Sequence, residues 1–66
     1  MYGTPKFTKG DRVRVRNLNS PYHSSVAVIK ASYFKEGIGF SYTVELQWLG
    51  HARLDSFVEQ ELEKVK

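Results

Sequence analysis

The stretch from Phe40 to Leu49 alternates apolar and polar side chains along its whole length, and this alternation constrains the fold more than any other feature of the chain. A repeat of two residues is typical of a β-strand with one buried face. One strand cannot bury that face by itself, so partner strands are required. We therefore predict a sheet whose core contains the apolar members of the stretch, which are Phe40, Tyr42, Val44, Leu46 and Trp48.

Three other segments have the composition of strands. From Arg12 to Asn17, valines and arginines alternate strictly, which predicts a half-buried strand with the arginines facing solvent. The segment 26–34 begins with four uninterrupted apolar residues, so we expect it to be buried on nearly both faces, with Lys30 pointing out and Tyr33 completing the core. A shorter strand over residues 52–57 follows a tight turn at Gly50-His51.

The C-terminal segment has two interpretations. Ser56 and Glu59 fit a capping box, and the spacing of the following apolar residues then predicts a short helix. Alternatively, residues 59–62 form one 3₁₀ turn and residues 63–65 a last strand. In both interpretations Leu62 and Val65 face the core.

The chain has 66 residues, which predicts one domain, here residues 9–66 after a flexible leader of residues 1–8. Cysteine is absent and the two histidines are far apart in the sequence, so we expect no disulfide, no metal site and no cofactor. No apolar run is long enough to span a membrane, and the first ten residues lack the apolar segment of a signal peptide. These features predict a cytoplasmic protein without a membrane partner.

The order of these segments is similar to that of the small SH3-like barrels. The resemblance is carried by the segments 10–15, 42–46, 48–50, 55–57 and 61–65. It points to the Tudor/KOW-like branch, and the start of the chain, residues 10–17, also resembles the C-terminal barrel of nitrile hydratase β subunits. The resemblance implies an all-β, five-stranded antiparallel barrel with a short helical turn or helix near the C-terminus.

Charge is divided unevenly along the chain. Residues 1–33 contain six basic residues and one acidic residue, whereas residues 34–66 contain four basic and six acidic residues. The arginines of the first strand span about 13 Å at alternate positions, a spacing that suits contacts to phosphates or to an acidic surface. A simpler explanation is that Arg and Lys side chains keep an exposed strand soluble and discourage it from pairing with strands of other molecules. The candidate binding residues are Arg12, Arg14, Arg16, Lys30, Tyr22 and His23.

These observations favour a non-enzymatic binding module. A barrel of this size is filled by its own side chains, so we expect no catalytic pocket. The leading hypothesis is weak electrostatic binding of DNA or RNA, assisted by the aromatic rings of Tyr22 and His23. The alternative is an accessory subunit that docks an acidic protein partner. Self-association through the acidic run Glu59, Glu61 and Glu63 is a further possibility.

Overall fold

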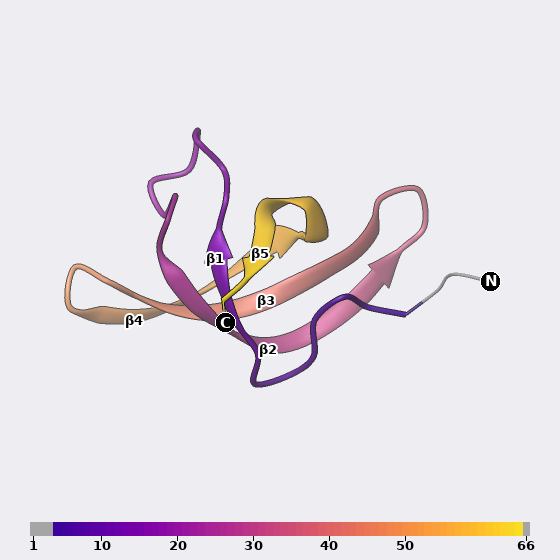
Figure 1. The fold of residues 1–66 in the computed structure, drawn as a ribbon, viewed down its shortest axis with the longest axis horizontal. Coiled ribbons are helices and arrows are strands. Elements are labelled where there is room, and N and C mark those ends of the chain that lie inside the picture. The colour runs from indigo at the N-terminus through magenta and orange to yellow at the C-terminus, as the bar shows by residue number, and fades with distance from the viewer. Residues whose placement is uncertain (1–3, 66) are drawn as a thin grey trace.

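The structure, a computed structural model, describes residues 4–65 and consists of antiparallel strands with one short turn of 3₁₀ helix (Figure 1). The strand order in the sheet is β4-β3-β2-β1-β5. The elements are β1 (Arg12–Val15), β2 (Val26–Lys35), β3 (Gly39–Trp48), β4 (His51–Val58), the turn η1 (Glu59–Glu61) and β5 (Leu62–Lys64). The predicted all-β class with five antiparallel strands is confirmed. At the C-terminus, the second interpretation is confirmed, a 3₁₀ turn followed by a last strand.

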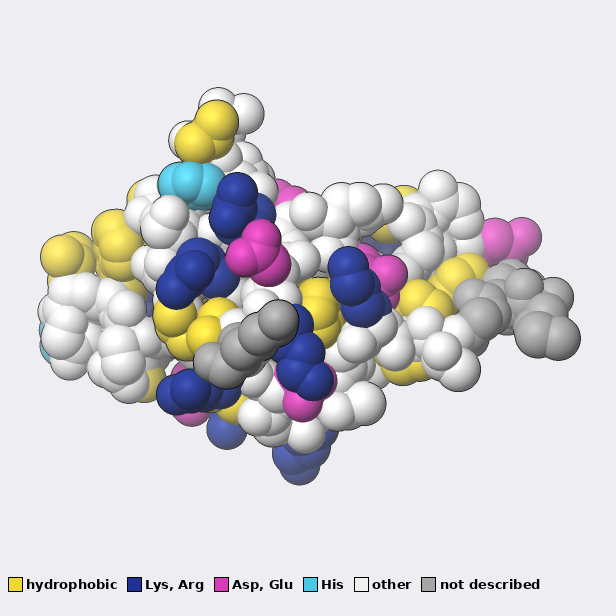
Figure 2. Space-filling model, in the orientation of Figure 1, with side chains coloured by type: hydrophobic (Ala, Val, Ile, Leu, Met, Phe, Trp, Pro, Cys, Tyr) yellow, Lys and Arg dark blue, Asp and Glu magenta, His cyan; other side chains and the backbone are white. Residues whose placement is uncertain are grey.

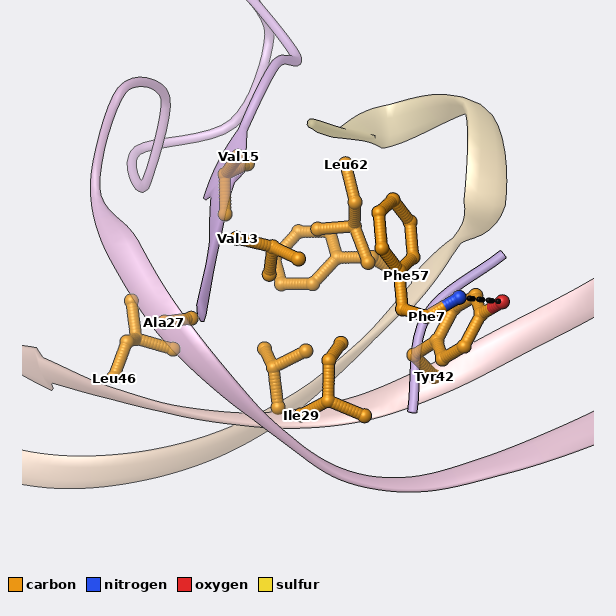
Figure 3. Packing of buried hydrophobic residues seen from close by; sticks show 10 residues of the cluster. Phe7, Val13, Val15, Ala27, Ile29, Tyr42, Leu46, Phe57 and Leu62 are labelled. Carbon is orange, nitrogen blue, oxygen red and sulfur yellow. Dashed lines mark hydrogen bonds between the residues drawn. The ribbon is translucent and has the colours of Figure 1, made fainter. Parts of the chain in front are cut away.

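The predicted closure into a barrel is wrong. The strands β4 and β5 are the two ends of the sheet order and do not pair with each other, so the sheet is open between them. The short β5 makes its ladder with β1, where Leu62 lies opposite Val15. Figure 3 shows the side chains of Leu62 and Phe57, from the two end strands, next to each other inside the fold. Side-chain packing rather than a backbone ladder therefore closes this side of the molecule.

The strand β2 belongs to both parts of the sheet. Its first residues pair with β1, where Arg12 lies opposite Val28. Most of its length pairs with β3, and the register shifts between Ile29 and Ala31. A bulge of this kind bends a strand and increases its twist. The bend lets the long β2 and β3 curve beneath the short β1 and β5, as Figure 1 shows.

The core contains one cluster of buried side chains contributed by every strand, and Figure 3 shows ten of its residues. The alternation in β1 and β3 predicts most of it correctly, since the inward positions of both strands are buried. Phe40 and Trp48, at the two ends of β3, are only half-buried. The cluster consists of Phe7, Val13, Val15, Ala27, Ile29, Tyr42, Val44, Leu46, Phe57 and Leu62.

The prediction that β2 is buried on both faces is wrong. Ala27 and Ile29 are buried, but Val26 is 43% exposed and Val28 is half-buried. Tyr33, which was expected to complete the core, is 42% exposed. The physical reason is that no second layer formed by residues 4–65 covers the outer face of the sheet, so even an uninterrupted apolar run alternates between core and solvent.

The N-terminal segment enters the core, contrary to the prediction of a flexible leader over residues 1–8. The ring of Phe7 is fully buried and packs edge-on against Tyr42, with 5.2 Å between the ring centroids. The backbone N–H groups of Lys6 and Phe7 donate to the Tyr42 hydroxyl at 3.0 and 3.3 Å, and Figure 3 shows the second of these bonds. The hydroxyl itself donates to a Glu59 carboxylate oxygen at 2.6 Å. Residues 1–3 of the predicted leader lie outside the described residues.

Candidate basic interaction face

The arginines of β1 face outward because the valines between them face inward. Val13 and Val15 are both fully buried in the core cluster. Successive side chains of a strand point to opposite faces, which places Arg12 and Arg14 on the outer side of the sheet. Arg12 is exposed and Arg14 is half-buried. The outward orientation predicted from the sequence is therefore confirmed for this strand.

A tight turn before β1 fixes where the strand begins. Gly10 has a φ of +95°, a backbone conformation that glycine adopts without steric cost. The Asp11 carboxylate accepts a hydrogen bond from the Thr8 backbone N–H at 3.1 Å. This hydrogen bond, together with the nearby Lys64 ammonium, lowers the pKa of Asp11 below its usual value. Asp11 thus remains ionised at the start of the basic strand.

The two strands beside β1 present different chemistry to the arginines. On the β2 side, Val28 lies opposite Arg12, and Val26 lies opposite Arg14. On the β5 side, Glu63 lies opposite Arg14. The basic strand is therefore bordered by a partly exposed apolar strip on one side and by an acidic residue on the other.

Two of the four candidate cations have an acidic partner within the chain. The Arg16 guanidinium lies 3.3 Å from a Glu63 carboxylate oxygen, and the Lys30 ammonium lies 3.5 Å from a Glu45 carboxylate oxygen. Arg12 and Arg14 form no ion pair with any residue of the range 4–65. The candidate face thus consists of an unpaired centre, Arg12 and Arg14, with two paired cations beside it.

A space-filling view shows the same mixture of charges. In Figure 2, Lys and Arg side chains gather over the middle of the face that carries β1 and β5, and Asp and Glu side chains lie among them. The sequence suggested that the C-terminal glutamates could oppose the arginines of a neighbouring copy. Within one chain, the β1–β5 ladder already brings Glu63 to Arg16. Sequence reasoning identified the acidic run but not this specific pair, because the pairing joins segments that are far apart in the chain.

Tyr22 lies apart from the basic strand. Its ring makes edge-on contacts with Trp48, at 5.0 Å between centroids, and with Phe57, at 6.5 Å. It packs against the core cluster, on the side of the sheet opposite to the arginines. Its ring is therefore already in contact with two aromatic side chains on the core side of the sheet.

His23 occupies a turn in the same loop. Its backbone N–H donates to the Ser20 carbonyl oxygen at 3.1 Å. The ring is half-buried, and Nδ1 is shielded from solvent without a hydrogen-bond partner among the described residues. Any polar contact that His23 makes to a ligand would therefore involve the other edge of the ring.

The surface offers few other candidate sites. Residues 4–65 form no pocket, and no group of three or more His, Cys, Asp or Glu side chains in this range is arranged to hold a metal ion. None of the helical segments described by the structure has the length and hydropathy needed to cross a bilayer. Neither the known protein families nor the curated proteins include a match to this sequence.

Proposed function

We propose that this protein is a non-enzymatic binding module that makes weak electrostatic contacts with nucleic-acid phosphates through the outer face of β1. The observation that carries the proposal is the pair of unpaired guanidinium groups of Arg12 and Arg14 on one exposed strand face. Residues at alternate positions of a strand lie about 6.6 Å apart. Each guanidinium presents a planar set of donors that matches the oxygens of a phosphate.

The paired cations extend this face rather than block it. The side chains of Arg16 and Glu63 are each 53% exposed, so their ion pair is surrounded by water. Exposed ion pairs contribute only about 0–1 kcal/mol. A phosphate can therefore replace the carboxylates of Glu63 and Glu45 at little cost, which brings Arg16 and Lys30 into contact with a bound strand. The number of phosphate contacts is then between two and four.

The fold is compatible with this use. A small, curved, five-stranded antiparallel sheet supports the resemblance to SH3-like barrels, and we propose that the chain is a relative of the Tudor/KOW-like branch whose sheet stays open at one side. The absence of cysteine from the sequence suits the reducing cytosol, which is the location that we propose.

A second candidate function is the docking of an acidic protein. The observation that favours it is the strip of Val26 and Val28 directly beside Arg14 and Arg12. Protein interfaces combine an apolar centre with charged groups at the rim, whereas nucleic-acid backbones offer little apolar surface. An acidic partner with an apolar centre would contact both the arginines and the valines.

Fluorescence anisotropy of a labelled single-stranded oligonucleotide at increasing salt concentration tests the first proposal. With two to four phosphate contacts, the logarithm of the affinity should fall against the logarithm of the salt concentration with a slope between about −1.4 and −2.8. Arg12→Ala/Arg14→Ala should abolish most of the binding. The control Lys6→Ala/Lys35→Ala removes the same charge from exposed side chains on other elements and should bind nearly as wild type.

Two results would contradict the nucleic-acid proposal. One is the absence of binding at low salt, and the other is an equal loss of binding in both double variants, which would indicate an effect of net charge alone. The same titration with polyglutamate in place of the oligonucleotide distinguishes the second candidate function, docking of an acidic protein, from nucleic-acid binding. Binding of polyglutamate without binding of the oligonucleotide would assign the face to an acidic protein.

A further inference from the structure

The outer edge of β4 is an unusually open backbone edge. This strand is the end of the sheet order, and within the described part of the chain it pairs only with β3. It spans eight residues, His51–Val58, without a proline, and its ladder with β3 keeps one register throughout. Natural proteins usually protect an edge strand with proline, bulges, charged side chains or very short length. Of these devices, β4 has only the two charges Arg53 and Asp55.

The opposite edge of the sheet is protected. The strand β5 has three residues, two of them charged. The difference between the two edges makes β4 the part of the sheet where another strand can add.

Hydrogen bonds at the C-terminal end of β4 show which of its residues face the open edge. The Ser56 N–H donates to the Asp55 carboxylate at 2.8 Å, and the Val58 N–H donates to the Glu61 carboxylate at 3.1 Å. Both N–H groups therefore point away from β3. Backbone groups of an antiparallel strand alternate between its two sides. By this alternation, Leu54 and Ala52 also direct their N–H and C=O groups toward the open edge.

We propose that β4 pairs antiparallel with β4 of a second copy of this chain, with Leu54 opposite Leu54 of the second copy. In this register the outward-directed backbone groups of the two strands meet as hydrogen-bonded pairs. Leu54 is 65% exposed in the single chain and would pack against its equivalent on the outer face. The second copy is inferred as the partner from the features of β4 alone, so this inference does not depend on the nucleic-acid proposal.

The charges of β4 select this register. With Leu54 at the centre, Arg53 of each copy lies opposite Asp55 of the other, which gives two opposite-charge pairs. A shift of the centre by one residue would place Arg53 opposite Arg53 or Asp55 opposite Asp55 and would turn the wrong backbone groups to the edge. A shift of the centre by two residues in either direction would leave Asp55 without an opposite charge and would place Arg53 opposite His51 or opposite a residue beyond the end of β4. In the dimer, the Asp55 carboxylate would release the Ser56 N–H, which then donates across the new ladder.

The test is sedimentation equilibrium of the whole chain at rising concentration, combined with charge changes in β4. The wild-type protein should dimerise at high concentration. Arg53→Asp and Asp55→Arg each create like-charge pairs, so each variant alone should dimerise about tenfold more weakly. An equimolar mixture of the two variants restores every opposite-charge pair and should form a heterodimer. Far-ultraviolet circular dichroism checks that both variants remain folded.

Three results would overturn the inference. A wild-type protein that stays monomeric at about 1 mM excludes pairing of any useful strength. Dimerisation that both single variants retain would place the interface elsewhere. Mixing the variants without recovery of the dimer would show that Arg53 and Asp55 do not face each other. The matched control Lys35→Asp, which makes the same charge change on an exposed residue of β2, should leave dimerisation nearly unchanged.

Discussion

The two faces of β1 differ completely, although their residues are immediate neighbours in the sequence. Val13 and Val15 on the inner face are fully buried, and Arg12 and Arg14 on the outer face meet solvent without an acidic partner among the described residues. The inner face contributes to the hydrophobic stability of the fold, and the outer face has the chemistry for binding. One strand therefore separates stability from function residue by residue, so substitutions can change one without the other.

The largest expected effect comes from placing a charge on the inner face. Val13→Asp buries a carboxylate without a partner, which should cost on the order of 3–5 kcal/mol and unfold a domain of this size. Arg14→Asp, one residue along the strand, makes the same new side chain on the outer face and should leave the protein folded. Circular dichroism and thermal unfolding measure both variants. Loss of structure in both variants, or in neither of them, would contradict the proposed difference between the two faces.

The second prediction concerns the Tyr42 hydroxyl, which belongs to a buried residue on the inner face of the sheet. Tyr42→Phe removes the acceptor for the N–H groups of Lys6 and Phe7 and the donor to Glu59. Loss of these hydrogen bonds should lower the free energy of unfolding by about 1–3 kcal/mol, as measured by urea denaturation. Hydrogen exchange at the amide of Phe7 should increase in the same variant. An unchanged stability would show that the inner face depends on apolar packing alone.

A third prediction follows from the pKa of the same hydroxyl. Burial, followed by the hydrogen bond to the Glu59 carboxylate, raises the pKa of Tyr42 above its ordinary value of 10.0. A pKa that is higher in the folded than in the unfolded protein adds stability below pH 10, and this stability is lost as the pH rises through the folded value. Urea unfolding between pH 8 and about pH 11 should show the loss in wild type. A loss of equal size in Tyr42→Phe would contradict this assignment.

The smallest expected effect lies on the outer face. Glu63→Gln removes the partner of Arg16 and should change the free energy of unfolding by less than about 1 kcal/mol, because the pair is exposed. The same change removes a carboxylate that competes with phosphate for the Arg16 guanidinium, so oligonucleotide affinity should rise. A weaker affinity would show that Glu63 positions the arginines rather than competes for them.

Sequence periodicity predicts the parts of this fold that depend on local pattern. The alternation in β1 and β3 identifies the inward side chains of both strands, and Leu62 is buried as predicted, whereas Val65 is half-buried and lies outside the core cluster. Periodicity fails where the tertiary arrangement decides burial. The apolar start of β2 indicates two buried faces, yet Val26 is exposed because none of the described residues forms a layer over the outer side of the sheet.

Contacts between distant segments account for the other differences. Phe7 reaches the core because the Tyr42 hydroxyl, far along the chain, binds the backbone beside it. No repeat or turn signal in the first eight residues indicates this contact. The cations of the candidate face are identifiable from the sequence, but the pairing of Arg16 with Glu63 depends on the β1–β5 register.

The division between the two faces of β1 is tested most directly by an NMR titration of isotope-labelled protein with a single-stranded oligonucleotide at low salt. We predict that the largest changes in amide resonances occur at Arg12 and Arg14 and at the valines opposite them, Val28 and Val26, whereas Val44 in the core changes little. Changes that instead cluster on the Tyr22–His23 loop or on β4, or no changes at all, would contradict the assignment of binding to the outer face.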